Sequence, residues 1–269
     1  MPKAAVVQLN GSSDVERNLQ VTESLVRAAA AEGAVLVATP EATTYLGPHD
    51  RKVALAEPVD GPTHQRLGAL AKDLGITLLV GSVAEKLDMA RAYNTSLVFG
   101  PDGALQATYR KMHLFDVDLA ASGGVAFQES AWTAHGSELV VTDTPLGRLG
   151  LSICFDLRFP EVYRALVDQG ATLLSVPSAF TAVTGAAHWH LLLQARAVET
   201  QCWVLAPAQW GPHDDKGLRR SFGHSLIVDP WGRVVAEVEE GEGYAVAEVD
   251  TDMVGRIRAQ IPMDANRRS

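Results

Sequence analysis

The sequence predicts an α/β protein in which two β-sheets pack face to face, with helices on their outer sides. Short apolar segments alternate with amphipathic segments of helical period along the whole chain. The same order of segments begins again near residue 149, which suggests that two related halves each contribute one sheet. Packing the two sheets against each other would bury both sets of apolar strands.

The first half is expected to contain three buried strands, two helices and a hairpin. Ser13 or Asp14 is the expected N-cap of the first helix, because a short polar side chain there can accept a backbone hydrogen bond. The expected strands span residues 3–9, 34–38 and 77–83. The expected helices span residues 14–32 and 63–74. The hairpin pairs residues 96–99 with 104–109 around the turn Gly100-Pro101-Asp102-Gly103.

The second half repeats this plan. Its hairpin pairs residues 225–228 with 233–238 around the turn Asp229-Pro230-Trp231-Gly232. The expected strands span residues 149–153, 172–176 and 202–207. The expected helices span residues 160–169 and 188–199.

Two pairs of segments carry the evidence for a repeat. Residues 33–40 (GAVLVATP) match residues 170–177 (GATLLSVP) 137 positions later, and residues 96–99 match residues 225–228 after 129 positions. We therefore infer an internal duplication, although such segments can also recur by chance in an α/β protein. The halves differ in the polar residue that follows the matched strand, Glu41 in one and Ser178 in the other, which indicates a functional site there.

Composition excludes several classes of protein. Charged residues make up 20% and hydrophobic residues 47% of the 269 residues, which is typical of a globular chain. The net charge of −9 disfavours nucleic-acid binding. No apolar run approaches the roughly 20 residues of a membrane span, and the first residues lack a signal-peptide core, so a cytoplasmic location is expected. No linker interrupts the chain, so one domain over residues 1–269 is expected.

Cys154 is the first candidate for chemistry. It ends an apolar strand and precedes a turn into a helix, where a helix N-terminus would stabilise a thiolate and free N–H groups would bind an oxyanion. A small buried side chain is the alternative interpretation, and it is favoured for Cys202, which lies inside an apolar run. In a reducing compartment both cysteines are expected as free thiols.

A cysteine nucleophile needs a group that accepts its proton. None of the eight histidines lies in an obvious partner motif, and His188 and His190 point to different helix faces, which also makes them a poor metal pair. Glu41 lies just beyond a strand end, where sites of α/β proteins gather, although a surface carboxylate is the alternative. Lys111 ends a hairpin strand and would stabilise an oxyanion, unless it is a solvated edge lysine.

Three segments together resemble the signature blocks of the nitrilase superfamily. They contain Thr39-Pro40-Glu41, residues 109–116 (YRKMHLFD) and residues 153–161 (ICFDLRFPE). Their glutamate, lysine and cysteine follow the order of the family, and the resemblance extends from about residue 6 to residue 262. It implies a four-layer α-β-β-α sandwich with internal pseudo-two-fold symmetry, no metal or organic cofactor, and a homodimer packed through the helices near Cys154.

The resemblance also implies roles for particular residues. Glu41 would be the general base, Lys111 the oxyanion stabiliser and Cys154 the nucleophile, with the backbone N–H of Phe155 as a second oxyanion donor. Glu129 falls where the family carries a second essential glutamate. The implied reaction is hydrolysis of a small-molecule amide through a thioester.

Residues 177–189 (PSAFTAVTGAAHW) are similar to the Nit amidase branch of that superfamily. The branch implies cleavage of the omega-amide of a 2-oxo dicarboxylate, either deaminated glutathione or α-ketoglutaramate. An amidohydrolase for aliphatic amides or N-carbamoyl amino acids remains the alternative. A catalytically silent binding protein on the same fold is disfavoured, because Glu41, Lys111 and Cys154 are all present.

Four residues are candidates for contact with the substrate. Ser178, Phe180 and Thr181 follow the strand that is symmetric to the one before Glu41. Arg158 is a candidate partner for a substrate carboxylate, unless it pairs with its own helix.

Three departures from the branch affect the substrate assignment: Thr39, Phe155 and His190 stand where the branch usually has a large apolar residue, Tyr and Glu. Arg219 and Arg220 are expected to be solvated.

Overall fold

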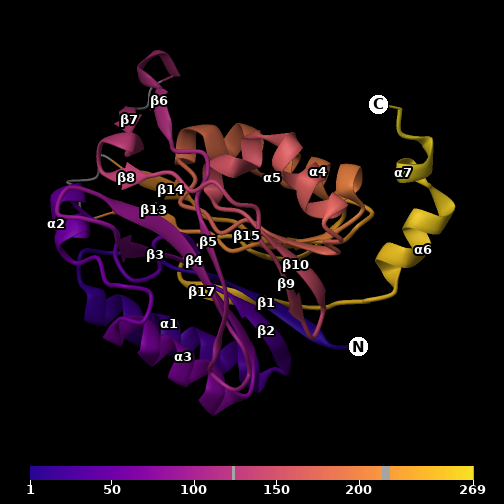
Figure 1. Cartoon of the computed structure of the whole chain (residues 1–269), viewed down its shortest axis with the longest axis horizontal. Helices are drawn as coiled ribbons and strands as arrows, with labels where there is room; N and C mark the ends of the chain where they lie inside the picture. Colours follow the sequence, from indigo (N-terminus) through magenta and orange to yellow (C-terminus); the bar gives the residue numbers. More distant parts are fainter. Residues whose placement is uncertain (123–124, 214–218, 269) are drawn as a thin grey trace.

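The computed structural model describes residues 1–122, 125–213 and 219–268 and forms an α-β-β-α sandwich, as the sequence predicts. In Figure 1, helices α1 and α3 cover one side of the sheets and helices α4 and α5 cover the other. No helix among the described residues is long and apolar enough to cross a membrane.

The first sheet has the strand order β17-β1-β2-β3-β4-β5, with β8 paired to β4. Strands β1, β2 and β3 are parallel, and β4 and β5 form the predicted antiparallel hairpin. The strands are β1 (Lys3–Gln8), β2 (Ala34–Ala38), β3 (Thr77–Lys86), β4 (Ala92–Phe99), β5 (Leu105–Arg110), β8 (Thr133–Ala134) and β17 (Gly243–Glu248).

The second sheet repeats this order as β16-β15-β12-β11-β10-β9. Strands β10, β11 and β12 are parallel, β15 and β16 form a hairpin, and the edge strand β9 is antiparallel to β10 just as β17 is to β1. The matched topologies confirm the two related halves. The strands are β9 (Val141–Thr144), β10 (Gly147–Leu151), β11 (Leu173–Ser175), β12 (Trp203–Ala206), β15 (Ser225–Val228) and β16 (Val234–Val238).

Apolar side chains from the facing sides of both sheets form one core, with Val6 and Leu36 from one half and Leu151 and Val204 from the other. The outer face of the first sheet packs on α1 (Val15–Ala31) and α3 (Pro62–Leu74), and α4 (Pro160–Asp168) and α5 (Ala182–Thr200) cover the second sheet. Asp14 caps α1 by accepting a hydrogen bond from the Arg17 N–H.

The two halves meet closely at Gly81 on β3. A Cβ atom at this position would overlap the carbonyl oxygen of Thr39 and contact Pro177, so no larger residue fits. Pro40 and Pro177, the last residues of the repeated segments, therefore both lie next to this glycine. The segments that carry Glu41 after β2 and Ser178 after β11 are therefore brought together at this point.

Several elements differ from the sequence prediction. Helix α5 begins at Ala182 rather than near residue 188, because the Thr181 side chain caps it. Segments without strong periodicity form further elements: α2 (His49–Ala54), β6 (Asp116–Asp118), β7 (Ala126–Gln128), β13 (Trp210–Pro212), β14 (Arg220–Phe222), α6 (Met253–Gln260), α7 (Met263–Asn266) and the 3₁₀ turns η1 (Ala120–Ser122), η2 (Glu129–Ala131) and η3 (Cys154–Arg158). In Figure 1, α6 and α7 extend away from the sandwich.

Candidate active site

A cavity of about 720 Å³ opens beyond the carboxyl ends of the central strands. Its wall includes Glu41, Lys111, Glu129 and Cys154, which are far apart in the sequence. The fold thus brings together the four side chains that the sequence singles out for chemistry. Much of the remaining wall is aromatic and apolar, a composition typical of small-molecule sites.

Cys154 lies at a sharp turn between β10 and η3. Its backbone is left-handed, with φ of 49°, and its N–H donates to the Pro177 carbonyl oxygen at 2.9 Å. A non-glycine residue in this region signals a conformation that the surroundings impose. Asp156 helps to impose it, because its buried carboxylate accepts hydrogen bonds from the Ile153 N–H (2.9 Å) and the Tyr109 hydroxyl (2.7 Å).

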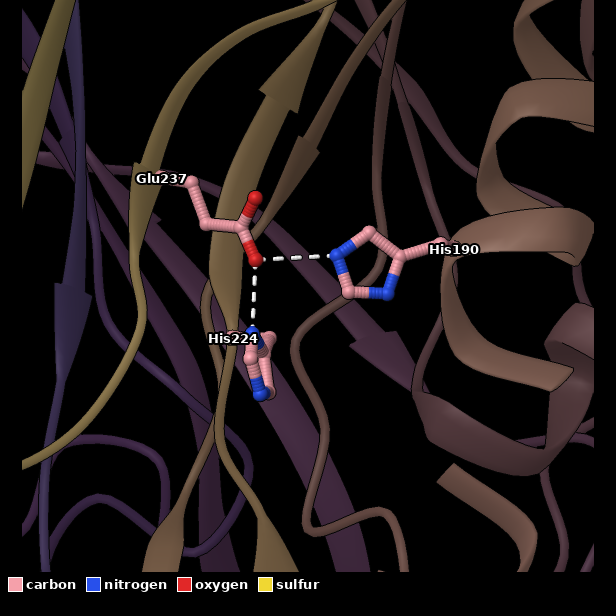
Figure 2. Close-up of side chains that lie close together, drawn as sticks. All are labelled: His190, His224 and Glu237. Atoms are coloured by element: carbon pink, nitrogen blue, oxygen red, sulfur yellow. Dashed lines mark hydrogen bonds and ion pairs between the residues drawn. The ribbon is translucent and has the colours of Figure 1, made fainter. Parts of the chain in front are cut away.

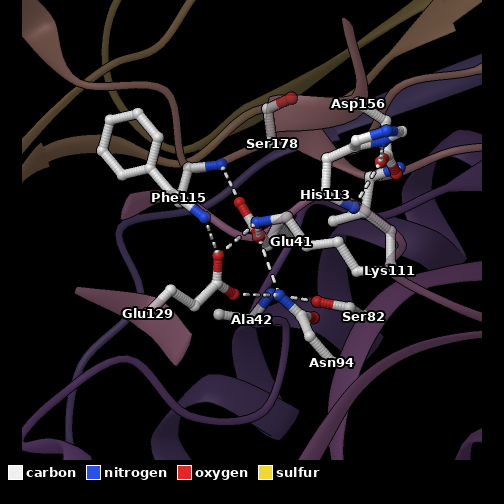
Figure 3. A network of polar contacts seen from close by, with 12 residues as sticks. Glu41, Ala42, Ser82, Asn94, Lys111, His113, Phe115, Glu129, Asp156 and Ser178 are labelled. Carbon is white, nitrogen blue, oxygen red and sulfur yellow. Dashed lines mark hydrogen bonds and ion pairs between the residues drawn. The ribbon is translucent and has the colours of Figure 1, made fainter. Parts of the chain in front are cut away.

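Lys111 is buried between two carboxylates. Its Nζ donates to Glu41 Oε1 at 2.9 Å and to Glu129 Oε2 at 2.8 Å. Asn94 on β4 bridges the same two carboxylates, with its Nδ2 2.8 Å from Glu41 Oε1 and 3.2 Å from Glu129 Oε1. Figure 3 shows the four side chains converging, so one ammonium and one amide hold both carboxylates in place.

This arrangement keeps the cluster charged. Burial alone would lower the pKa of Lys111, but the carboxylates of Glu129 and Glu41 outweigh it and raise this pKa well above its ordinary value. Burial would raise the pKa of Glu129, but the ammonium groups of Lys111 and Lys52 outweigh it and lower this pKa. The ion pair is therefore present across the neutral pH range.

Glu41 is oriented by both halves of the molecule. Ala42, the next residue, is left-handed with φ of 58°, and its N–H donates to Ser82 Oγ at 2.9 Å (Figure 3). From the second half, the Ala179 N–H donates to Glu41 Oε2 at 2.8 Å and Gln209 Nε2 donates to the Glu41 carbonyl oxygen at 2.9 Å. These contacts leave the carboxylate little freedom to rotate.

The thiol of Cys154 rests in its neutral form. Burial and the nearby Glu41 carboxylate raise the pKa of Cys154 well above its ordinary value, and the opposing effect of Lys111 is smaller. The sequence predicts a thiolate stabilised by a helix N-terminus, which is not what the structure shows. Cys154 instead begins the short 3₁₀ turn η3 (Cys154–Arg158), and a hydrogen bond to Glu41 raises the pKa of the thiol further.

The other predicted site residues have different positions. Phe155 lines the cavity as the second residue of η3, where backbone N–H groups have no partner within the helix. Phe180 and Thr181 also line it. Ser178 does not line the cavity in the part of the chain that the structure describes. Its buried hydroxyl instead donates to the Val176 carbonyl oxygen at 3.0 Å.

Arg158 is likewise not part of the described cavity wall. Its guanidinium lies 3.4 Å from His188 Nδ1 and 5.2 Å from the centre of the Phe180 ring, so it packs behind a residue of the wall.

Several residues of the cavity wall were not predicted from the sequence. Asn94 gives a weak signal, because an asparagine within a buried strand is uncommon. Lys52 on α2 gives none, since the surrounding segment has no clear pattern. Arg219 and Arg220 were expected to be solvated, yet both line the cavity. Lys52 on α2 and Arg219 just before β14 lie outside the repeated strands and helices, so local sequence does not reveal their place in the cavity wall.

Comparisons with known proteins identify the family of the chain. The carbon-nitrogen hydrolase family model matches residues 3–259. Deaminated glutathione amidase from Bos taurus is 41% identical to this chain, covering 100% of the chain and 82% of the relative. Omega-amidase NIT2 from Homo sapiens is 40% identical, covering 99% of the chain and 95% of the relative.

Solved structures show the same fold. The Saccharomyces cerevisiae protein Nit3, described as a member of branch 10 of the nitrilase superfamily, has a TM-score of 0.87 and 34% identity, covering 100% of this chain and 97% of Nit3. A mutant amidase from Nesterenkonia sp. AN1 carries the acetamide moiety of fluoroacetamide covalently attached to its active-site cysteine. It has a TM-score of 0.81 and 25% identity, covering 98% of this chain and 96% of that one.

The buried charge cluster predicts a large stability loss on Lys111→Met. The change removes the cation that bridges the two buried carboxylates, so we expect a loss of about 3–5 kcal/mol in the free energy of unfolding. Adding Glu129→Gln to this variant should recover part of the loss, because it removes one of the unpaired charges. Urea denaturation of the single and double variants measures both effects.

Lys72→Met on the exposed face of α3 is the matched control and should change stability by less than about 0.5 kcal/mol. Additive losses for Lys111→Met and Glu129→Gln would contradict a coupled cluster.

Proposed function

The chain belongs to the carbon-nitrogen hydrolase family and hydrolyses amide carbon–nitrogen bonds other than peptide bonds; we propose that it does so through a thioester on Cys154, as a single domain of residues 1–269. One observation carries the proposal. Lys111 bridges Glu41 and Glu129 in the cavity that Cys154 lines, and this supplies a nucleophile, a base and a cation at one place.

In the first step the Cys154 sulfur attacks the amide carbonyl carbon while Glu41 takes the thiol proton. The carbonyl oxygen becomes an oxyanion, which the Phe155 N–H and the Lys111 ammonium stabilise. Glu41 then gives the proton to the amide nitrogen, the carbon–nitrogen bond breaks, and ammonia leaves. The acyl group remains on sulfur as a thioester.

In the second step Glu41 takes a proton from water, and the resulting hydroxide attacks the thioester carbon. The carbon–sulfur bond then breaks, the acid leaves, and the proton on Glu41 returns to the sulfur. Every proton has a donor and an acceptor among the substrate, water and these side chains, so the proposed steps call for no metal or organic cofactor.

Glu129 is proposed to act by positioning Lys111. It accepts hydrogen bonds from Lys111 and from the Phe115 N–H at 2.8 Å each, which fixes the ammonium beside Glu41. With Glu129 beside it, Lys111 then remains charged while Glu41 gains and loses its proton.

We propose the omega-amide of a 2-oxo dicarboxylate as the substrate, as in deaminated glutathione or α-ketoglutaramate. The names of the relatives support this class. The cavity adds support, because Lys52, Arg219 and Arg220 give its wall cationic groups that suit substrate carboxylates. Phe180 and Thr181 would border the substrate.

Among the described residues, the Lys52 ammonium has no hydrogen-bond or ion-pair partner, so it is available to pair with a substrate carboxylate.

We further propose a homodimer packed through α4 and α5. Helix α5 exposes Leu191 and Val198, of which Leu191 is 67% exposed, and Trp231 extends this apolar surface. A second copy would cover these side chains. A cytoplasmic location is proposed with it, in keeping with the two free cysteines.

Cys154→Ala should abolish ammonia release. We expect a loss of at least about 10³-fold with α-ketoglutaramate and deaminated glutathione, since the nucleophile is removed. Cys202→Ala is the matched control, because Cys202 is also buried but lies outside the cavity lining, and it should retain activity. Full release by Cys154→Ala would refute the thioester, and release only from propionamide or N-carbamoyl-β-alanine would refute the proposed substrate class.

Lys52→Met should weaken the binding of an anionic amide. Loss of one charge-assisted hydrogen bond predicts a rise in KM for α-ketoglutaramate of about 10- to 150-fold, with a smaller change in kcat. The KM for propionamide, which has no carboxylate, should stay within about 2-fold, and Lys52→Arg should restore most of the loss. Equal effects on both substrates would show that Lys52 supports the cavity rather than the carboxylate.

A further inference from the structure

Three potential metal ligands converge between α5 and the hairpin of β15 and β16. His190 belongs to α5, His224 lies between β14 and β15, and Glu237 belongs to β16. His190 Nε2 donates to Glu237 Oε1 at 2.9 Å and His224 Nδ1 donates to the same oxygen at 2.6 Å. Figure 2 shows both rings directed at one carboxylate oxygen. The three ligand atoms lie within 4.8 Å of one another.

The backbone holds His224 in this orientation. Its φ of 57° is left-handed, and it follows Gly223, which has φ of 81°. The Trp189 indole N–H donates to the His224 carbonyl oxygen at 2.8 Å, and the Phe222 ring stacks on the His224 ring with centroids 4.3 Å apart. A non-glycine residue adopts this conformation only where its surroundings require it, so the ring is preset toward Glu237.

We propose that His190, His224 and Glu237 bind one Zn²⁺ ion. Two neutral imidazoles and one carboxylate provide the donor atoms that zinc prefers, and their total charge of −1 suits a divalent cation. Water would occupy the fourth position. This site goes beyond the amidase reaction, because none of its ligands lines the catalytic cavity in the described chain.

The distances suit a site that closes on an ion. Ligand atoms of tetrahedral zinc, at about 2.0–2.1 Å from the metal, lie about 3.3 Å apart. To reach that spacing from Glu237 Oε1, the His190 ring would move outward by about 0.4 Å and the His224 ring by about 0.7 Å. To bind an ion, His190 Nε2 and His224 Nδ1 would give up the protons that they donate to Glu237, and each ring can carry its proton on its other nitrogen instead.

The surroundings favour a cation and allow it to enter. The side chains of His190, His224 and Glu237 are 36%, 26% and 25% exposed, so solvent reaches the site. A bound ion would join α5 to the hairpin strand β16.

That junction matters because the first turn of α5 forms part of the cavity wall, including Ala182 and Thr184. Zinc bound between His190 on α5 and Glu237 on β16 would hold the helix against the second sheet. The role inferred for the ion is therefore structural.

The test is zinc binding by the full chain after treatment with a chelator. Competition with a chromophoric chelator should give one equivalent of Zn²⁺ for the unmodified protein, and His224→Ala and Glu237→Gln should each weaken binding by at least about 10-fold. At zinc concentrations about 100 times the Kd, the melting temperature of the unmodified protein should rise by about 5–10 °C, and those of His224→Ala and Glu237→Gln should rise less. His135→Ala, at an exposed histidine outside the cluster, is the matched control and should bind zinc normally.

Cys154 is a competing zinc ligand, so the titration is repeated with Cys154→Ala. Undiminished binding by this variant supports the site, and loss of binding assigns the zinc to the thiol and overturns the proposal. The absence of stoichiometric binding would also overturn it. Glu237→Gln keeps the shape of the side chain and a carbonyl acceptor, so unchanged melting of its zinc-free form excludes misfolding as the cause of weak binding.

Discussion

The buried pairing of Lys111 with Glu41 and Glu129 is the interaction on which the site depends. Removing three charges from water is costly unless each finds a partner, and here each carboxylate shares the ammonium and the Asn94 amide. Burial of Cys154 and the Glu41 carboxylate of this cluster raise the pKa of the thiol, so the sulfur keeps its proton at rest. Nucleophile and base therefore form one unit, in which the thiol loses its proton only as it attacks.

The duplicated fold explains how this unit is assembled. Each half ends a central strand in proline, and the two prolines meet at Gly81. One half supplies Glu41 and Lys111, whereas the other supplies Cys154 and the Ala179 N–H that orients Glu41. The catalytic groups thus lie across the junction of the sheets, where neither half alone would form a closed site.

The sequence predicted the sandwich because buried strands and amphipathic helices have distinct periods, and it predicted Glu41, Lys111, Glu129 and Cys154 because their segments resemble a family. It did not predict Asn94, Lys52 or the position of Arg219, since these depend on how non-repetitive segments cross the cavity. Ser178 and Arg158 follow the right elements, but their side chains turn to the Val176 carbonyl and to His188. The sequence did not predict the His190–Glu237 contact, because these residues lie 47 positions apart and no local pattern links them.

Measuring the protonation state of Cys154 tests most directly the claim that Glu41 acts as a base on a neutral thiol. It is measured by ultraviolet titration of the free enzyme, with the spectrum of Cys154→Ala subtracted. Base catalysis by Glu41 on a neutral thiol predicts no thiolate absorbance at pH 7, with absorbance appearing only above the ordinary thiol pKa of about 8.5. Thiolate absorbance from Cys154 near pH 7 would contradict it, because the sulfur would then need no base for its attack.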